Sequence, residues 1–352
     1  MGAASPERLP LDLVTGFLGS GKTTLINRVL QDPAFAGAMV IVNEFGEVGL
    51  DHLLISSAED QVVLLDSGCL CCAVSGSLRD TLIDLFSRRG SGSVAPFDRI
   101  IVETSGLANP APLVASLLGD SALTPRCSLS QVLTLVDAVH GLDTLARYQE
   151  ARRQVAFADR LLITKTDLAS AEQVDELQRV LATLNPQALI ERRQQDDPPA
   201  VHFTAISARV PAPAGMQADT TPAWLRGPLR PQYADDAAGD VHGEAFRHIA
   251  THVLRVPHPV EWGAYAAWTD AMRRRFGKRL LRCKGVLAVG ADGARWVVQG
   301  VQGYFARPAP LPAAPDAVGY LICIGEALDR AELDETLALL DADPTSERNP
   351  VS

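Results

Sequence analysis

Residues 16–23 read GFLGSGKT, and this stretch decides the fold. It matches the phosphate-loop pattern G-x-x-x-x-G-K-[ST] in full, and it lies between an apolar run, LDLVT, and a helical one, TLINRVLQD. The glycines let successive backbone N–H groups turn toward phosphates, and the following helix adds its positive N-terminal end. We expect Lys22 to reach the β- and γ-phosphates of a nucleotide and Thr23 to ligate Mg²⁺. The nucleotide-binding residues expected in this segment are Gly16, Gly19, Ser20, Gly21, Lys22, Thr23 and Thr24.

Apolar runs alternate with helical stretches from Leu11 to about Ser207. Runs that are apolar throughout are typical of a parallel sheet covered on both faces, and the helical stretches between them supply the crossovers. One such helix, SAEQVDELQRVLATL, opens with Ser170 as its N-cap. The sequence therefore predicts an α/β fold, a P-loop NTPase domain with a mainly parallel sheet over residues 8–210. Strands are predicted at LDLVTG, AMVIVNE, QVVLLDS, DRIIVETSG, LSQVLTLVDA, DRLLITKTD and AVHFTAIS.

A smaller domain is predicted after a linker. Residues 211–245 are rich in Pro, Ala, Gly and Asp and have no period, as linkers do. Residues 246–345 then contain strand patterns in HIATHVLRV and AVGYLICIG and helical patterns in VEWGAYAAWTDAMRRRF and LDRAELDETLALLD. LLRCKGVLAV and ARWVVQGVQGYF flank Asp292-Gly293, a strong hairpin signal. This order predicts a small α+β sandwich.

Two further motifs follow the phosphate loop in the order found in GTPases. Glu103 and Gly106, in ETSG after a predicted strand, stand where an acidic residue and a glycine sense Mg²⁺ and the γ-phosphate. Lys165 and Asp167 form a K-x-D at the end of another strand. The Asp carboxylate can accept hydrogen bonds from guanine N1–H and N2–H₂, a pair of donors that adenine lacks. The order of motifs favours GTP over ATP.

The guanine-binding element is completed by residues on either side of the K-x-D. Ser207 and Ala208 follow the last predicted strand of the domain, where a contact with guanine O6 is expected. The residue before the K-x-D lysine is Thr164, where GTPases usually carry Asn. We expect this departure to weaken guanine affinity.

Three of the six cysteines are crowded into GCLCC, residues 68–72. In an extended strand neighbouring side chains point to opposite faces, but at a turn Cys69, Cys71 and Cys72 can converge. Three thiolates make a partly complete tetrahedral Zn²⁺ site with the fourth position open, which suits a metal that has to leave again. Thiolate ligands favour Zn²⁺ or Cu(I), and Co²⁺ and Fe²⁺ stay open as alternatives because ligand softness alone does not set selectivity. The alternatives are a transient disulfide from Cys69 to Cys71 or Cys72, and small buried side chains.

Composition excludes several classes of protein. The chain has 352 residues, is 47% hydrophobic and carries a formal net charge of −10, so it can bury a large core but lacks the clustered basic residues of a general nucleic-acid binder. It has no apolar run long enough for a bilayer and no secretory signal at its start. The scattered Cys127, Cys283 and Cys323 do not form a disulfide framework with the cluster. We expect a cytoplasmic protein that does not bind membranes or nucleic acid.

The combination of GFLGSGKTT, NEFGEVGLDH (43–52), GCLCC and ETSGLANP (103–110) resembles the CobW-like metallochaperone GTPases. LLRCKGVLAV, VVQGVQGYF and YLICIG resemble the C-terminal domain of that family, so the resemblance covers about residues 10–342. Its members include zinc-transferring chaperones, proteins of cobalamin synthesis and activators of nitrile hydratase. The resemblance lacks one feature, because many relatives carry a His-rich tract near the interdomain region and this chain has only His242 there.

The resemblance implies a GTP-hydrolysing metallochaperone that binds Zn²⁺, or Co²⁺ or Fe²⁺, and delivers it to a client protein. By similarity Asn43 to Asp51 would be the first switch, with Glu44 and Thr23 at Mg²⁺, and Glu103 and Gly106 would belong to the second switch. Lys165 and Asp167 would hold guanine. Cys69, Cys71 and Cys72 would hold the transferred metal.

The thiol cluster lies between the two predicted switches, so the state of the γ-phosphate can alter its geometry. Lys22, Thr23 and Glu103 are the expected catalytic residues, acting with Mg²⁺ by positioning and neutralising charge. No side chain is an evident base for the attacking water, so intrinsic turnover should be slow. The competing interpretation is a P-loop ATPase or small-molecule kinase with structural or redox cysteines. The sequence leaves the client and the oligomeric state open.

Overall fold

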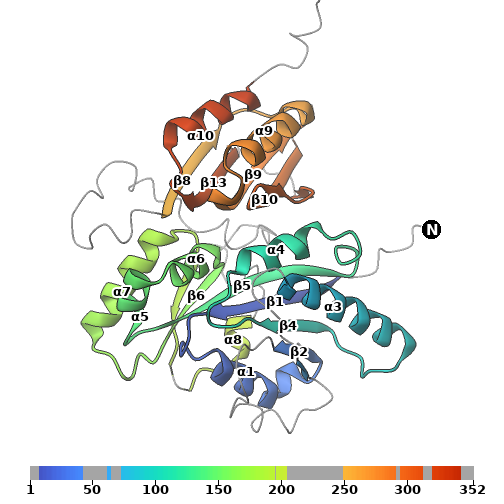
Figure 1. Cartoon of the computed structure of the whole chain (residues 1–352), viewed down its shortest axis with the longest axis vertical. Helices are drawn as coiled ribbons and strands as arrows, with labels where there is room; N and C mark the ends of the chain where they lie inside the picture. Colours follow the sequence, from blue (N-terminus) through green and yellow to red (C-terminus); the bar gives the residue numbers. More distant parts are fainter. Residues whose placement is uncertain are drawn as a thin grey trace, which may run out of the picture. The chain divides into compact units, whose positions relative to one another are not determined.

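The computed structural model describes residues 8–42, 62–64, 73–194, 196–203, 249–290, 294–311 and 319–341. The chain divides into two compact units, Met1–Ala208 and Arg209–Ser352 (Figure 1). The predicted linker, residues 211–245, and the Asp292-Gly293 turn lie outside the described residues, as do Glu44, the cysteine motif, Ser207 and Ala208.

In the described part of the first unit, seven strands form one sheet in the order β3-β2-β4-β1-β5-β6-β7, and every pair in it is parallel. The predicted parallel sheet is confirmed. Because β1 is central, the phosphate loop at its carboxyl end lies between the ends of β4 and β5. The strands are β1 (Leu9–Gly16), β2 (Ala38–Val42), β3 (Val62–Leu64), β4 (Arg99–Glu103), β5 (Cys127–Asp137), β6 (Arg160–Thr164) and β7 (Leu189–Arg192).

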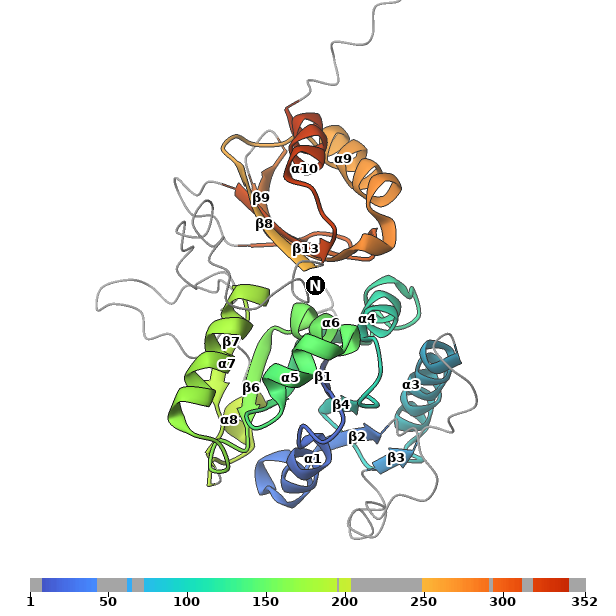
Figure 2. The ribbon, with the colours of Figure 1, turned by 60° about the vertical axis from the view of Figure 1, so that its left-hand side comes forward.

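Helices cover both faces of this sheet (Figure 2). Side chains of α1 and Phe203 of α8 pack on one face, with Val14, Leu133 and Leu162 of the strands beneath them. On the other face α6 contacts β1, α4 contacts β5 and α7 contacts β6. The helices are α1 (Lys22–Gln31), α3 (Ala73–Ser91), α4 (Pro110–Gly119), α5 (Gly141–Arg147), α6 (Gln149–Phe157), α7 (Ala171–Leu184) and α8 (Ala200–Phe203), with a 3-10 turn at Pro33–Phe35.

The last strand of the first unit differs from the sequence prediction. The segment AVHFTAIS was expected to be a strand, but its first four residues form α8. Pro198 and Pro199 precede them and accept the backbone N–H groups of Val201 and His202, because proline fixes a helical φ and has no N–H to give to a sheet. The seventh strand is β7, a four-residue edge strand whose half-exposed residues lack an apolar run.

The second unit is a six-stranded antiparallel sheet in its described part, with the main order β11-β10-β9-β13-β8. The α9 and α10 helices pack against it, so the predicted α+β sandwich is confirmed. The elements are β8 (Ile249–Val256), α9 (Trp262–Arg275), β9 (Leu280–Val289), β10 (Ala294–Val301), β11 (Tyr304–Phe305), β12 (Ala309–Pro310), β13 (Gly319–Glu326) and α10 (Arg330–Leu337), with 3-10 turns at Gly277–Arg279 and Ala338–Leu340.

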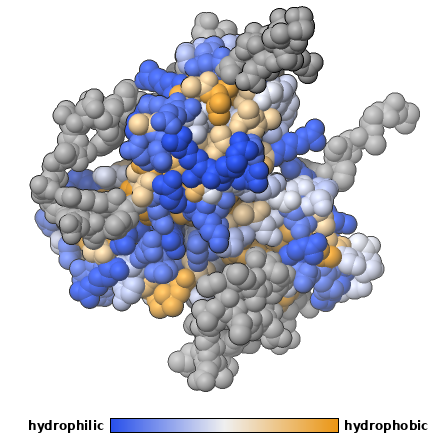
Figure 3. Space-filling model, turned by 45° about the horizontal axis from the view of Figure 1, so that its top comes forward, coloured by the Kyte–Doolittle hydropathy of each residue, from blue (hydrophilic) through white to orange (hydrophobic). Residues whose placement is uncertain are grey.

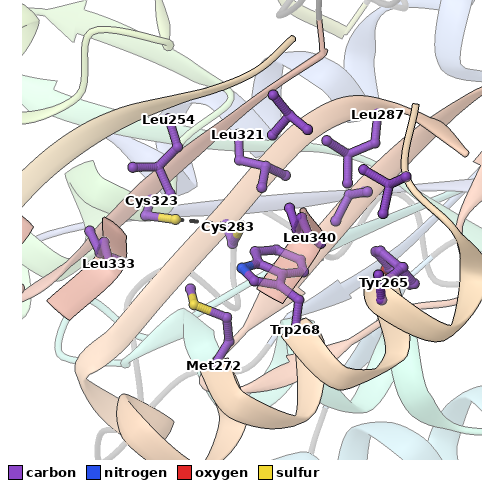
Figure 4. Close-up of a cluster of buried hydrophobic side chains, with 14 of the residues drawn as sticks. Leu254, Tyr265, Trp268, Met272, Cys283, Leu287, Leu321, Cys323, Leu333 and Leu340 are labelled. Carbon is purple, nitrogen blue, oxygen red and sulfur yellow. Dashed lines mark hydrogen bonds between the residues drawn. The ribbon is translucent and has the colours of Figure 1, made fainter. Parts of the chain in front are cut away.

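The core of the second unit contains two cysteines in contact (Figure 4). Cys283 of β9 and Cys323 of β13 face each other in register, and their Sγ atoms are 3.7 Å apart. Neither has any solvent exposure, and Trp268 and Met272 of α9 belong to the same core. The Cys323 thiol and burial raise the pKa of Cys283 well above its usual value, so it stays a protonated thiol.

No helix among the described residues is long and apolar enough to cross a bilayer. On the face in Figure 3, hydrophobic residues form small separate groups among hydrophilic ones.

Candidate functional site

The phosphate loop turns on three glycines. Gly16, Gly19 and Gly21 have φ values of 142°, 74° and 94°, a range that side chains rarely adopt. A Cβ at Gly16 would also lie 2.4 Å from the carbonyl oxygen of Leu135 on β5. Gly21 is the N-cap of α1, so the loop leads directly into the helix N-terminus. The backbone therefore has the shape that anion binding at a helix start requires.

Lys22 lies inside the loop. Its Nζ donates hydrogen bonds to the carbonyl oxygens of Gly16, at 3.0 Å, and Phe17, at 3.2 Å. Only 8% of the residue is exposed. The positive charge is thus held beside the loop backbone, and the predicted contact of Lys22 with the β- and γ-phosphates stays a prediction. Thr24, also expected here, is an exposed residue in the first turn of α1.

Thr23 and Glu103 meet at the end of the sheet. The Thr23 hydroxyl donates to Glu103 Oε1 across 3.1 Å, and Glu103 is 5% exposed at the carboxyl end of β4. Because β4 pairs with β1, the two residues are brought together from positions 80 apart in sequence. A hydroxyl and a carboxylate are hard oxygen ligands, the kind that Mg²⁺ prefers. This donor set fits a magnesium ion bound with a nucleotide.

The loop after β4 lies directly against the phosphate loop. A Cβ on Gly106 would come within 2.8 Å of the Leu18 backbone N and 2.9 Å of its Cα, so only glycine fits without a shift. Thr104 donates its hydroxyl to that of Thr15 across 2.8 Å. Gln154 of α6 donates its Nε2 to the carbonyl oxygens of Gly106 and Ala108, at 3.1 and 3.0 Å. Movement in one loop must therefore affect the other.

The K-x-D loop is tied to the phosphate loop and to β5. The hydroxyl of Thr164 donates to the carbonyl oxygen of Ser20 across 2.8 Å. Lys165 Nζ lies 2.6 Å from Asp137 Oδ2, and the Lys165 backbone has a left-handed φ of 55°. Asp167, two residues further on, is exposed. The structure thus brings Lys165 and Asp167 to the same edge of the sheet as Lys22.

Two residues of this arrangement were not expected from the sequence, Asp137 and Gln154. Asp137 ends the apolar run of β5, and an acidic residue at the carboxyl end of a parallel strand was the available signal. Gln154 lies within a helical stretch, and nothing in its neighbours distinguishes it. Both can be recognised as residues of the site only when the arrangement of the strands and helices is known.

A pocket of about 120 Å³ lies beside the nucleotide loops. It is bounded by phosphate-loop residues 17–20, the end of β5, α5, α6 and Lys165. Lys22, Thr23 and Asp167 are not among its lining residues, so it is a neighbour of the phosphate-binding surface and not that surface itself. His140, which follows the end of β5, also lines it.

The expected transition-metal ligands and part of the nucleotide site are not described. Cys69, Cys71, Cys72, Glu44, Ser207 and Ala208 lie outside the described residues, so their roles stay predictions. Within the described ranges, no group of three or more His, Cys, Asp or Glu side chains is placed to hold a metal ion. His252 is a residue of β8 with its Nε2 3.0 Å from the Leu328 carbonyl oxygen.

Comparison with protein families gives a match for each unit. The model described as "CobW/HypB/UreG, nucleotide-binding domain" matches residues 10–191, more than half of the chain. The chain belongs to the CobW/HypB/UreG family. The model of the C-terminal domain of the cobalamin synthesis protein CobW matches residues 249–340, so both units are those of this family.

Curated relatives span nearly the same length. The zinc chaperone YjiA of Escherichia coli (strain K12) is 31% identical over 299 residues, covering 84% of this chain and 86% of that protein. The zinc chaperone CobW of Pseudomonas aeruginosa is 29% identical, with 94% and 91% covered. A crystal structure of Zn(II)-bound YjiA GTPase from E. coli shares the fold, with a TM-score of 0.65 and 24% identity over 95% of this chain and 99% of that one.

Proposed function

We propose that this chain is a GTP-hydrolysing metallochaperone that carries Zn²⁺ on Cys69, Cys71 and Cys72 and releases it to a client protein. The observation that carries the nucleotide half of the proposal is the meeting of Thr23 and Glu103, 3.1 Å apart, beside the buried Lys22. The metal half is supported by GCLCC in a family whose relatives include proteins named zinc chaperones.

The residues around the phosphate loop have separate roles in this proposal. The loop backbone from Gly16 to Gly21 and the N-terminus of α1 bind the phosphates. Lys22, now bonded to two loop carbonyls, turns to the β- and γ-phosphates and neutralises charge that develops during hydrolysis. Ser20 and Thr24 belong to the same loop and helix start. Gly106 lets the loop after β4 lie against the phosphate loop, where it can respond to the γ-phosphate.

Thr23 and Glu103, with Glu44, would hold Mg²⁺ when the nucleotide is bound. The bound ion supplies charge neutralisation at the β- and γ-phosphates. Thr23 places its hydroxyl oxygen at the helix start, and Glu103 offers a carboxylate fixed on the central sheet. With no general base assigned, turnover is expected to be slow.

Guanine is recognised at the K-x-D loop in this proposal. Asp167 accepts from the N1–H and N2–H₂ donors, Lys165 lies beside it, and Ser207 and Ala208 contact O6. The hydroxyl of Thr164 donates to the carbonyl oxygen of Ser20 and so joins this loop to the phosphate loop, although a hydroxyl has one donor hydrogen where an Asn amide has two.

The metal is the cargo, and the nucleotide controls its binding. Cys69, Cys71 and Cys72 come between the two predicted switches in sequence. GTP would hold the thiolates in a binding arrangement, and hydrolysis would release the metal to a partner in the cytoplasm. Such coupling is typically worth about 1–3 kcal/mol and has to be reciprocal for binding. The second unit is the proposed docking module for the client.

The test is metal affinity by chelator competition, for Zn²⁺ and Co²⁺ separately. It is measured with Mg²⁺ plus GDP or a non-hydrolysable GTP analogue, on the wild type and on Cys71→Ser/Cys72→Ser. We expect affinity to change several-fold between nucleotides and to be lost in the double variant. Cys127→Ala, which alters a buried thiol on β5 outside the motif, serves as the control.

Two results would overturn the proposal. Equal metal affinity with both nucleotides would mean that the thiols and the phosphate loop are not coupled. Metal binding that survives the cysteine changes would place the metal elsewhere. Transfer of phosphate from ATP to a small molecule would favour the competing kinase interpretation.

A further inference from the structure

The lysine of the K-x-D loop is anchored by a residue outside that motif. Lys165 Nζ lies 2.6 Å from Oδ2 of Asp137, at the carboxyl end of the neighbouring strand β5. The lysine side chain is 38% exposed, whereas that of Asp137 is 11% exposed. A charged pair at this distance is a strong, directional hydrogen bond. It fixes the end of a long side chain that would otherwise sample many rotamers.

The carboxylate of Asp137 is itself held in place by backbone hydrogen bonds, so it can serve as a fixed anchor for the Lys165 ammonium group. Its Oδ1 accepts from the backbone N–H groups of Val139, at 2.7 Å, and His140, at 3.3 Å. The next residue, Ala138, donates its N–H to the carbonyl oxygen of Thr164 across 2.9 Å. One carboxylate oxygen therefore holds the turn after β5, and the other is directed at Lys165.

The backbone of the K-x-D loop needs such support. Lys165 has a φ of 55°, and a non-glycine residue there is strained unless its surroundings hold it. The turn is closed by the Leu168 N–H, which donates to the Lys165 carbonyl oxygen across 3.0 Å. The hydroxyl of Thr166 donates to the Arg193 carbonyl oxygen at 2.9 Å. Among the described residues, the ion pair to Asp137 thus fixes the end of the Lys165 side chain.

The pair also lies close to the phosphate loop. Asp137, Lys165, Gly19 and Ser20 line one pocket of about 120 Å³. An ammonium group released from Asp137 could turn to phosphate oxygens, which every nucleotide carries whatever its base. Paired with Asp137, the ammonium group is held at the carboxyl end of β5 instead.

We propose that Asp137 is a positioning residue for guanine selection, acting through Lys165. This inference rests on the proposed function, because it takes Lys165 and Asp167 as the guanine-binding pair. The side chain of Asp137 does not touch the nucleotide. It keeps the lysine charge at the base-binding edge and away from the phosphates, so its loss weakens guanine nucleotides without weakening adenine nucleotides.

The experiment compares the dissociation constants of GDP and ADP, each with Mg²⁺, for the wild type and Asp137→Asn. Asn keeps the size of the side chain and an oxygen for the backbone N–H groups but removes the charge. We expect GDP affinity to fall about ten-fold, since a hydrogen bond between charged groups is lost, while ADP affinity is unchanged or rises. The ratio of the two constants is a quantity that a merely destabilised fold would not change.

Two further variants sharpen the result. Asp175→Asn breaks the exposed ion pair with Arg192, 2.5 Å long, in the same unit, and should leave the ratio unchanged. In a Lys165→Gln background, Asp137→Asn should have no further effect on the ratio, because its action passes through the lysine.

Each other outcome has a distinct meaning. A wild type without preference for GDP overturns the proposed function and this inference with it. A preference for GDP that Asp137→Asn retains overturns the inference alone. Equal loss of GDP and ADP affinity in Asp137→Asn also overturns it, since that result describes a purely structural residue.

Discussion

Thr164, the residue before the K-x-D lysine, links two loops of the nucleotide site. The sequence analysis expected it to weaken guanine affinity because GTPases usually carry Asn there. The structure shows that its hydroxyl donates to the Ser20 carbonyl oxygen and so links the K-x-D loop to the phosphate loop. The sequence alone was enough to choose the motif residues, because each lies in a short local motif and the motifs follow one another in the order found in GTPases. These residues are Lys22, Thr23, Glu103, Lys165 and Asp167. Asp137 could not be chosen in this way, because only the pairing of β5 with β6 brings it to Lys165.

Glu103→Gln tests the proposed magnesium site. Removing the charge while keeping the shape should lower the rate of GTP hydrolysis at least about ten-fold and shift activity to higher Mg²⁺ concentration. The measurement is phosphate release during a Mg²⁺ titration. Glu172→Gln, at an exposed position of α7, is the control. An unchanged Mg²⁺ dependence in Glu103→Gln would remove this carboxylate from the site.

Asp12 makes the stability of the first unit depend on pH. Its side chain is fully buried on β1, and burial raises its pKa to about 6 although Arg99 lies 3.4 Å away. The folded chain therefore binds a proton more tightly than the unfolded chain does. The stability from this proton is present below pH 3.8, is progressively lost as pH rises, and is gone above about pH 6.

Asp12→Asn should remove this dependence. Relative to the wild type, the free energy of unfolding of the variant should rise by about 1 kcal/mol between pH 5 and pH 7.5. Urea denaturation of both proteins at the two pH values measures it. A constant difference between the two proteins would show that Asp12 titrates alike in the folded and unfolded chains.

At the scale of elements, apolar runs predicted most of the strands, and a capping residue predicted the start of a helix. Strands β1, β2, β4, β5 and β6 are buried over most of their length, and Ser170 caps α7 as expected, with Gln173 as its capping-box partner. The edge strand β7 was missed because an edge needs no apolar run. The strand predicted at AVHFTAIS was wrong for residues 200–203, which form a short helix behind two prolines, with Phe203 packing on Phe35; residues 204–207 lie outside the described residues.

Gly106→Ala tests the contact between the loop after β4 and the phosphate loop. The added methyl group would lie 2.8 Å from the Leu18 backbone N, so one loop has to move. We expect GTP hydrolysis to fall several-fold while the melting temperature changes little, because both loops are at the sheet edge. Gly90→Ala on α3 is the matched control, with nothing within 4 Å of its added Cβ. Wild-type activity in Gly106→Ala would mean that this contact is not needed.

At the scale of the whole molecule, the two units have separate cores, and family models match them separately. This division was predicted from composition, because the Pro- and Gly-rich stretch between the patterned segments cannot build a core. The sequence could not supply the geometry of the cysteine motif, which depends on tertiary structure and stays a prediction.

Trp268→Ala tests whether the units are independent. Trp268 is fully buried in the core of the second unit, so its truncation should cost about 3–5 kcal/mol there. GDP affinity of the first unit should stay within two-fold of wild type, and GDP should shift only the unfolding transition of the first unit. Calorimetry with and without GDP measures both the unfolding transition of each unit and the effect of GDP on it. A large loss of GDP affinity would mean that the second unit supports the nucleotide site.

The buried cysteines have a practical consequence for following metal release. Cys127, Cys283 and Cys323 are all buried, and burial raises the pKa of Cys127 to about 11, so these thiols should react slowly with an alkylating reagent while the chain is folded. Any fast alkylation must then come from Cys69, Cys71 and Cys72. The rate of alkylation by iodoacetamide, followed by mass spectrometry, should therefore report on these three thiols alone. It should give the metal occupancy of the thiol motif in each nucleotide state without any engineered label.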